Sequence, residues 1–255
     1  MSGIQAAPAP WKLKGRNWIF VLSGISKNAS FPAGFADPNE AEALASGGEF
    51  VGGQGMIQIV SYTESPVGTL LTFDIKSDDE LIYLPGRWKY ADGTVAFRIT
   101  RIYVSSKEST ENGRRNWNIP KHVANFNIHT AENGTTSVTV SHPNASSPFF
   151  EATIKAIPIL SRISVPVNLR ILGEYTALMQ PPLQSGELPE EVATKQWAGL
   201  NPGMKGSARL VTITPGLNGK VGDGVGFPAI APWSIGVAMD PLDLDFYEPS
   251  LYDSR

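Results

Sequence analysis

Cysteine is absent from this sequence of 255 residues. Its absence excludes disulfide bonds, a thiolate nucleophile and any zinc or iron–sulfur site built on cysteine. Histidine is also scarce, being found only at His122, His129 and His142. No two of these have the spacing of a helical metal site, so a metal would depend on carboxylate ligands. We expect no metal site.

Charge is scarce and nearly balanced. Lys and Arg number 21 and Asp and Glu number 24, which gives a formal net charge of -3. No basic cluster with interleaved aromatic residues occurs, which argues against a nucleic-acid partner. Apolar runs are too short to span a bilayer, and residues 1–10 lack the charged and apolar regions of a signal peptide. We expect a cytoplasmic protein without a membrane partner.

Glycine and proline, in contrast, are abundant, with 25 and 20 residues. Asp92-Gly93, Asn133-Gly134 and Asn218-Gly219 each lie between apolar or β-branched stretches. Such dipeptides are typical of hairpins, because a type I′ turn needs positive φ at both central residues. The predicted strands are residues 55–62, 80–84, 94–104, 135–141, 149–156, 208–214 and 233–240.

Helical patterns are few. Residues 39–46 and 187–198 are the best candidates, and a short helix is expected to begin at Pro120, with Asn118 near its cap. The sequence thus predicts a mainly β (α+β) protein whose antiparallel sheet closes into a barrel or folds over as a sandwich. Because no internal repeat and no distinct linker occur, we expect residues 1–255 to form a single domain.

Lys121 lies in the most unusual segment, residues 112–126. Its neighbours Ile119, Val123 and Phe126 are apolar, and two arginines precede it. Apolar surroundings, a helix N-terminus and nearby cations disfavour the ammonium form, so we expect a lowered pKa for Lys121. A lysine nucleophile needs that shift, because only the free amine attacks a carbonyl. The alternative is a solvated lysine, which is the usual place of this residue.

Two further residues are candidates for acid–base chemistry. His122 is either a proton shuttle beside the amine or a hydrogen-bonded structural residue. Glu80 closes the polar stretch 76–80 and enters a predicted strand. It either faces a pocket or belongs to a polar turn. The pattern alone leaves both alternatives open.

The spacing Gly113-Arg114-x5-Pro120-Lys121 resembles the Schiff-base segment of the acetoacetate decarboxylase-like superfamily. In that family a Gly-Arg-Glu is followed by a Pro-Lys-Lys, whose first lysine is the nucleophile. The resemblance therefore implies that Lys121 forms a Schiff base. We expect Arg114 and Trp117, which belong to the same segment, to contact the substrate.

Two more matches occur in the family's chain order. Residues 10–18 resemble the segment that carries an arginine for the substrate carboxylate, and this implies that role for Arg16. Residues 62–68, followed by Asp79-Glu80, are similar to the strand entry that carries an active-site carboxylate. This implies that Glu80 is the active-site carboxylate.

The similarity covers most of residues 10–126, and residues 224–233 resemble uncharacterised fungal members. It implies the family fold, which is a cone-like antiparallel β barrel with an additional sheet and a few short helices. It also implies a homo-oligomer. The barrel agrees with the hairpin-rich pattern described above.

Four departures from the family pattern bear on the chemistry. His122 replaces the second lysine, and Arg115 replaces the glutamate after Gly-Arg. A second active-site glutamate, expected near Ile57 or Gln58, is absent. Residues 69–78 form an insertion at a place where the family has a very short connection, so we expect them to reshape the mouth of the pocket.

The resemblance favours a Schiff-base lyase that decarboxylates a β-keto acid or acts on a related small-molecule carbonyl substrate. Such a reaction needs no metal or organic cofactor, because the iminium group accepts the electrons. An aldolase–dehydratase, or another tailoring enzyme of specialised metabolism, is an alternative that uses the same imine. A barrel that only binds a hydrophobic ligand is the non-catalytic alternative.

Overall fold

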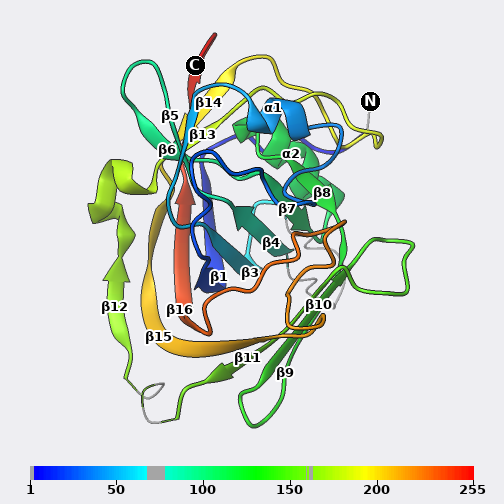
Figure 1. Ribbon diagram of the computed structural model, residues 1–255, viewed down its shortest axis with the longest axis vertical. Coiled ribbons are helices and arrows are strands. Elements are labelled where there is room, and N and C mark those ends of the chain that lie inside the picture. Colours follow the sequence, from blue (N-terminus) through cyan, green and yellow to red (C-terminus); the bar gives the residue numbers. More distant parts are fainter. Residues whose placement is uncertain (1–2, 68–77, 159, 161–162) are drawn as a thin grey trace.

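The computed structural model describes residues 3–67, 78–158, 160 and 163–255. Most of these residues lie in two β-sheets, accompanied by short helices (Figure 1). In chain order, the strands of the larger sheet are β1 (Trp11–Val21), β3 (Met56–Glu64), β4 (Asp78–Leu84), β7 (Arg101–Val104), β8 (Lys121–Val123), β9 (Asn125–Thr130), β10 (Thr136–Ser141), β11 (Phe150–Ala156), β12 (Val165–Asn168), β15 (Gly203–Pro215) and β16 (Ile235–Phe246). Within the described residues, no helix is both long enough and apolar enough to cross a membrane.

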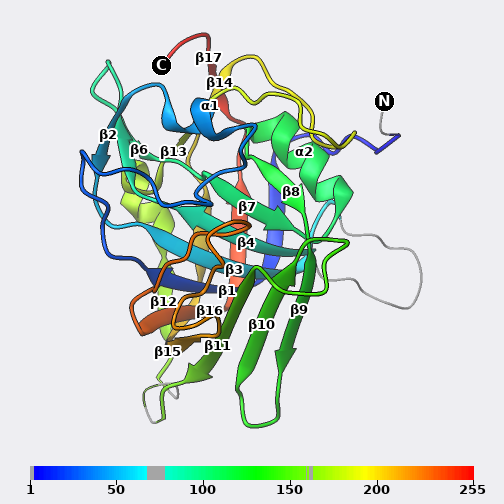
Figure 2. The same cartoon turned by 45° about the vertical axis from the view of Figure 1, so that its right-hand side comes forward.

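The larger sheet curls into a nearly closed barrel (Figures 1 and 2). Its strand order is β8-β7-β4-β3-β1-β16-β15-β11-β10-β9, with β12 added beside β15. Neighbouring strands are antiparallel except β7 and β8, which are parallel. The two edge strands β8 and β9 follow each other in the chain with only Ala124 between them, which brings the edges of the sheet together.

A smaller sheet and the helices gather at one end of the barrel (Figures 1 and 2). The strand order of this sheet is β17-β14-β13-β6-β5-β2. Its strands are β2 (Glu49–Gly52), β5 (Arg87–Lys89), β6 (Val95–Phe97), β13 (Leu178–Gln180), β14 (Trp197–Leu200) and β17 (Ser250–Tyr252). The helices are α1 (Ala41–Ala45), α2 (Lys107–Trp117) and a 3₁₀ segment at Leu169–Thr176.

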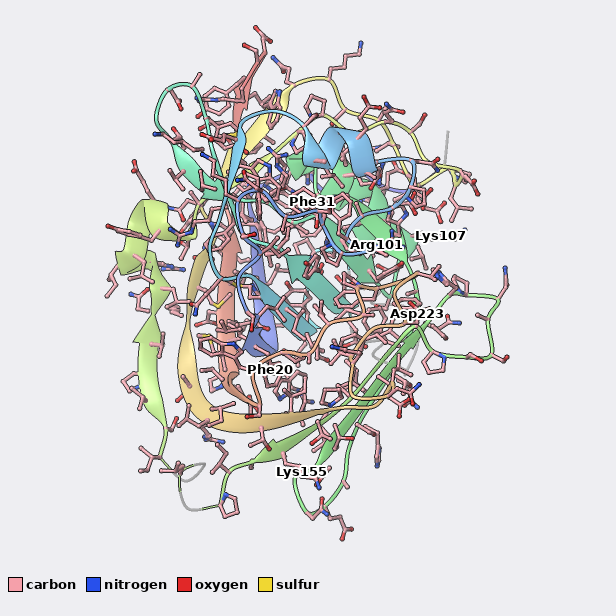
Figure 3. The ribbon with its side chains drawn as sticks, viewed as in Figure 1. Phe20, Phe31, Arg101, Lys107, Lys155 and Asp223 are labelled. Atoms are coloured by element: carbon pink, nitrogen blue, oxygen red, sulfur yellow. The ribbon has the colours of Figure 1, made fainter. Side chains whose placement is uncertain are left out.

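Two apolar clusters pack on opposite faces of the larger sheet. Phe20, which Figure 3 labels inside the barrel, belongs to one cluster together with Ile59 and Leu81. Val60 and Ile82, the next residues along two of these strands, belong to the cluster outside it. Successive side chains of a strand point to opposite faces, so each strand serves both clusters. The same alternation decides which of the candidate site residues can meet.

The predicted fold class is confirmed, and the structure has strands at all the predicted positions. Residues 94–104 form two strands rather than one, because Arg98 turns inward between them and donates hydrogen bonds to the carbonyls of Leu44 and Ser46. Strand β1 was not predicted, although Trp11-Lys12-Leu13-Lys14 alternates apolar and polar residues.

The helix predictions are less accurate. Residues 39–46 contain α1, but residues 187–198 form turns that lead into β14. In that segment the Glu191 carboxylate accepts a hydrogen bond from the Leu188 backbone N–H, which satisfies the backbone without a helix. The residues after Pro120 form β8, so the helix expected to begin there is wrong.

The helix of this region, α2, precedes β8. Ser106 caps its start, since the Ser106 hydroxyl accepts a hydrogen bond of 3.1 Å from the Ser109 backbone N–H. Asn118 ends it in the left-handed conformation, with φ of 55°. The serine cap was the signal in the sequence that indicates this helix.

The three predicted turns are present. At Asn218-Gly219 both residues have positive φ, 50° and 77°, as a type I′ turn requires. At the other two dipeptides only Gly93 and Gly134 have positive φ. These hairpins therefore use wider turns in which the glycine occupies the left-handed position.

Candidate active site

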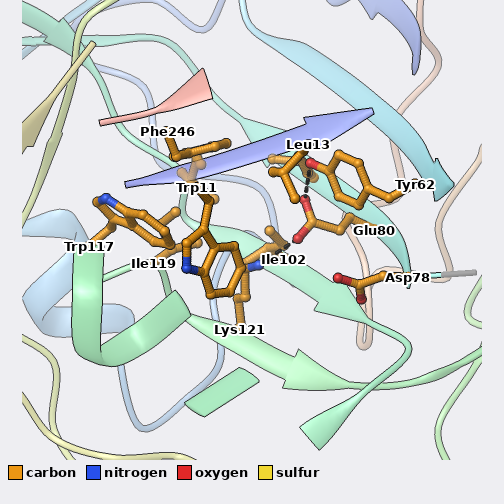
Figure 4. Close-up of a pocket in the computed structure, with 12 residues that line it drawn as sticks. Trp11, Leu13, Tyr62, Asp78, Glu80, Ile102, Trp117, Ile119, Lys121 and Phe246 are labelled. Carbon is orange, nitrogen blue, oxygen red and sulfur yellow. Dashed lines mark hydrogen bonds and ion pairs between the residues drawn. The ribbon is translucent and has the colours of Figure 1, made fainter. Parts of the chain in front are cut away.

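A small pocket lies on the outward face of the larger sheet, beside α2 and β1 (Figure 4). Its free volume is about 20 Å³, which is room for about one water molecule. Its lining is mostly apolar and consists of Trp11, Leu13, Tyr62, Asp78, Glu80, Ile82, Ile99, Ile102, Trp117, Ile119, Lys121 and Phe246. A substrate larger than water must therefore displace some of these side chains.

A buried ion pair occupies the centre of the pocket. Lys121 Nζ lies 2.5 Å from Glu80 Oε1, and each side chain is only 5% exposed. Lys121 Nζ also donates to the Ser109 hydroxyl at 3.0 Å. The Tyr62 hydroxyl donates to the other oxygen of Glu80 at 3.1 Å (Figure 4). Both oxygens of Glu80 thus have partners, as a buried charge requires.

Tyr62 stays a hydrogen-bond donor over the whole physiological range. Burial, together with the charges of Glu80 and Asp78, raises the pKa of the Tyr62 hydroxyl well above its usual value. The Tyr62 proton therefore remains available to fix the orientation of the Glu80 carboxylate.

Helix α2 crosses Lys121 at Gly113. A Cβ atom on Gly113 would lie 2.6 Å from Cδ and 2.7 Å from Cε of Lys121. Both distances are far below van der Waals contact. The glycine of the Gly-Arg motif therefore makes the space through which the lysine side chain reaches the pocket.

Asp78 is a second carboxyl group in the pocket, and the sequence pattern did not single it out. It precedes Glu80 by two residues on β4, so both side chains lie on one face of the strand. Asp78 Oδ2 accepts a hydrogen bond from the Ser65 hydroxyl at 3.3 Å. Asp78 Oδ1 is buried and has no hydrogen-bond partner within the described residues.

The protonation of Asp78 follows from these surroundings. Burial, and next the charge of Glu80, raises the pKa of Asp78 to about 7, although Lys121 acts in the opposite direction. Asp78 thus carries a proton on a fraction of molecules near neutral pH. The spacing of two carboxyl groups, Asp78 just before the predicted strand 80–84 and Glu80 at its first position, was the signal that could have identified it.

His122 does not enter this pocket. It follows Lys121 on β8, so its side chain lies on the opposite face of the strand. His122 Nδ1 lies 2.7 Å from Glu191 Oε1, and Nε2 lies 3.2 Å from Glu40 Oε2. Burial lowers the pKa of His122, but the hydrogen bonds and charges of Glu191 and Glu40 outweigh it and raise the pKa to about 9.

Arg114 does not line the pocket either. Its guanidinium is fully buried and lies 2.5 Å from Glu40 Oε1. It also donates to the carbonyls of Gln184 at 2.7 Å, Val192 at 3.1 Å and Lys121 at 3.4 Å. Arg114 therefore holds the backbone of the lysine strand in place, and its donors are directed at the protein.

Arg16 and Trp117 have different positions relative to Lys121. Trp11 and Leu13 of β1 line the pocket. Arg16 points to the opposite face of the same strand and lines a separate hollow. Trp117 lines the pocket, and its indole N–H donates to the Tyr247 carbonyl at 2.8 Å. The structure thus brings Lys121, Glu80 and Trp117 together and places Arg16, Arg114 and His122 elsewhere.

The remaining expectations concern the insertion and metals. Of the insertion at residues 69–78, only Asp78 belongs to the residues that the structure describes. Among those described residues, no group of three or more His, Asp and Glu is arranged to hold a metal ion. The functional groups that the pocket offers are therefore one amine, two carboxyl groups and two hydroxyls, from Lys121, Glu80, Asp78, Tyr62 and Ser109.

Solved structures share this fold. The acetoacetate decarboxylase of Legionella pneumophila subsp. pneumophila str. Philadelphia 1 superposes with a TM-score of 0.58 at 11% identity, over 97% of this chain and 88% of that one. An acetoacetate decarboxylase-like enzyme from Sphingomonas wittichii RW1 superposes with a TM-score of 0.59 at 11% sequence identity, over 98% of this chain and 95% of that one. The enduracididine biosynthesis enzyme MppR, complexed with pyruvate, superposes with a TM-score of 0.55 at 13% sequence identity, over 98% of this chain and 92% of that one. No protein-family model and no curated protein matches the sequence.

The charged state of His122 predicts a pH-dependent stability. Its pKa is about 9 in the folded state and about 6.5 in an unfolded chain. Its contribution, about 3 kcal/mol, is therefore complete below about pH 6.5 and is lost as the pH rises through about 9. Chemical denaturation between pH 6 and pH 10 should show that the stability gap between wild type and His122→Gln narrows over this window. A gap that stays constant would contradict the prediction.

The crossing of α2 over Lys121 predicts an unusual effect of Gly113→Ala. In a helix interior this change normally stabilises by about 1 kcal/mol. Here the added Cβ meets the lysine side chain, so we expect a loss of about 1–3 kcal/mol from overpacking. Denaturation curves should show the loss in the wild-type background and its disappearance in Lys121→Ala, which lacks Cδ and Cε. Equal losses in both backgrounds would rule out the contact as the cause.

Proposed function

We propose that Lys121 forms a Schiff base with a small keto acid or a related carbonyl compound, and that the protein is a carbon–carbon lyase. The observation that carries the proposal is a buried amine that faces an apolar pocket and is paired with Glu80 at 2.5 Å. Sharing a fold with acetoacetate decarboxylases supports it. The free volume of the pocket favours a substrate with a small carbonyl end.

Each polar group of the pocket has a role in imine formation. Glu80 accepts a proton from the Lys121 ammonium, and the free amine then attacks the carbonyl carbon. A carbon–nitrogen bond forms, and the carbonyl oxygen takes up a proton from Asp78. Loss of water then leaves an iminium group on Lys121. Tyr62 holds Glu80 in the orientation that receives the proton.

The reaction that we propose first is decarboxylation of a β-keto acid. The bond between the α-carbon and the carboxylate breaks, carbon dioxide leaves, and the electron pair forms an enamine as the iminium nitrogen becomes neutral. The enamine takes up a proton at carbon, and water hydrolyses the resulting imine to release the ketone and free Lys121. Opposite charges disappear in the bond-breaking step, and an apolar lining favours such a step.

Aldol condensation followed by dehydration is the second candidate. The described lining holds two acidic groups, Asp78 and Glu80, and no arginine. A β-keto acid would therefore bring its carboxylate beside Asp78 and Glu80 with Lys121 as the one cation of the described lining, whereas an aldol route can also use an aldehyde or ketone that has no carboxylate. One structure of the neighbour MppR holds the condensation product of pyruvate and imidazole 4-carboxaldehyde, which supports this alternative.

Borohydride trapping tests the Schiff base. The protein is incubated with acetoacetate or with pyruvate, reduced with borohydride and measured by intact mass. We expect one stable adduct per chain, assigned to Lys121 by peptide mapping, and at least a tenfold lower yield in Lys121→Met. Lys195→Met, which removes an exposed lysine, should leave the yield unchanged.

The lysine variant needs a folding control, because it leaves Glu80 buried without its partner. Loss of one member of a buried pair costs about 3–5 kcal/mol. The double variant Lys121→Met/Glu80→Gln removes both charges, and we expect it to fold stably and to form no adduct. Carbon dioxide release from acetoacetate separates decarboxylation from the aldol route. No adduct with any carbonyl compound would leave only the ligand-binding barrel.

The proton-donor role of Asp78 predicts a pH-dependent effect of Asp78→Asn. Because the pKa of Asp78 is about 7, the wild-type carboxyl can donate a proton below that pH and loses this ability above it. The initial rate of adduct formation in wild type should exceed that in Asp78→Asn by at least tenfold at pH 6. The two rates should converge above pH 8. A ratio that is independent of pH would contradict this role.

A further inference from the structure

A second hollow is lined in part by the β9–β10 hairpin. Figure 2 shows that this hairpin lies at the end of the barrel away from the helices. The volume of the hollow is about 390 Å³, and the hollow shares no lining residue with the Lys121 pocket. The lining comes from β1, β9, β10, β11, β15 and β16 and from the turn between β9 and β10. It consists of Arg16, Trp18, Thr130, Gly134, Thr136, Ile154, Ala156, Arg209, Val211, Ala238, Met239 and Asp240.

Strand register explains why this end is hollow. Trp18 pairs with Ala238, and Ala238 pairs with Arg209, so these three residues form one row across β1, β16 and β15. The backbones at the two ends of the row are about 10 Å apart, which is two strand spacings. Arg16 lies two residues from Trp18 on the same face of β1. The small side chain of Ala238 leaves free space between the two arginines.

The two arginines give the hollow a positive potential. Among the described residues, the side chains of Arg16 and Arg209 make no hydrogen bond and no ion pair. The Arg16 guanidinium lies 5.6 Å from the centre of the Trp18 ring, which orients it within the hollow. Asp240 is the one acidic group among the described lining residues. Two permanent cations therefore face a single anion, with their donors unused.

The floor of the hollow is apolar. Trp18, Ile154 and Val211 are buried and belong to the cluster inside the barrel. The hydroxyls of Thr130 and Thr136 lie 2.9 Å apart and satisfy each other. A ligand of this hollow therefore needs an anionic end for the guanidinium groups and an apolar body for the floor.

We propose that this hollow binds an organic carboxylate with an apolar, preferably aromatic, body. Arg16 and Arg209 hold the carboxylate, because a planar guanidinium donates two parallel hydrogen bonds to it. The body lies against the apolar floor formed by Trp18, Ile154 and Val211. This binding does not involve Lys121 and stands whether or not that lysine forms an imine.

Titration calorimetry with 2-naphthoate tests the proposal, and uncharged 2-naphthamide is the matched ligand. We expect the naphthoate to bind wild type at least tenfold more tightly than the amide. Arg16→Gln and Arg209→Gln should each weaken naphthoate binding at least fivefold. Lys155→Gln is the matched control, because Lys155 follows Ile154 on β11 and is an exposed cation at the same end of the barrel (Figure 3).

Lys121→Met separates this site from the proposed active site. We expect it to bind naphthoate like wild type, and we expect Arg209→Gln to keep the borohydride adduct at Lys121. Melting temperatures identify any variant that fails to fold, and the comparison of the two ligands needs no variant. Equal affinity for naphthoate and naphthamide, no binding of naphthoate to wild type, or loss of binding in a Lys121→Met protein that still melts cooperatively would each overturn the proposal.

Discussion

The buried ion pair between Lys121 and Glu80 is the interaction on which the arrangement of the site depends. Either charge alone in that position would cost several kcal/mol, so the fold has to bring β4 and β8 together. These strands are not neighbours, because β7 lies between them. Lys121 is in register with Ile102 of β7, and Glu80 with Val104. Only a long side chain reaches the carboxylate across the intervening strand, and Gly113 gives it the space.

The adjacent residues Lys121 and His122 of β8 point to opposite faces of the sheet and make different kinds of contact there. Lys121 faces the pocket, whereas His122 faces Glu40 and Glu191. Arg114 joins the same network through Glu40 and also binds the carbonyl of Lys121. A set of charges that are paired at neutral pH thus fixes the backbone of the lysine, which leaves the amine itself in contact with groups that can exchange protons.

The fold class and part of the site could be predicted from the sequence. Lys121, Glu80 and Trp117 were predicted from a resemblance in motif order, and the structure brings them into one pocket. Motif order gives residue identity but not the face of a strand, and for this reason Arg16 and His122 were expected beside the amine. Asp78 could not be recognised as a group with a raised pKa, because that shift arises from burial and from charges distant in the chain. The alternation of side chains tells which residues share a face only when the strand itself has been predicted. Strands β1 and β8 were not predicted, so the faces of Arg16 and His122 could not be assigned.

Strand β1 contributes alternate residues to both hollows, with Trp11 and Leu13 on one side and Arg16 and Trp18 on the other. Point substitutions on either face can therefore accumulate independently during evolution. A single-residue insertion or deletion between Leu13 and Arg16 exchanges the two faces for the remainder of the strand, unless it is absorbed by a bulge such as those that already interrupt the pairing of β1 with β3 and β16 here. The length of this short stretch is therefore under stronger structural constraint than its composition.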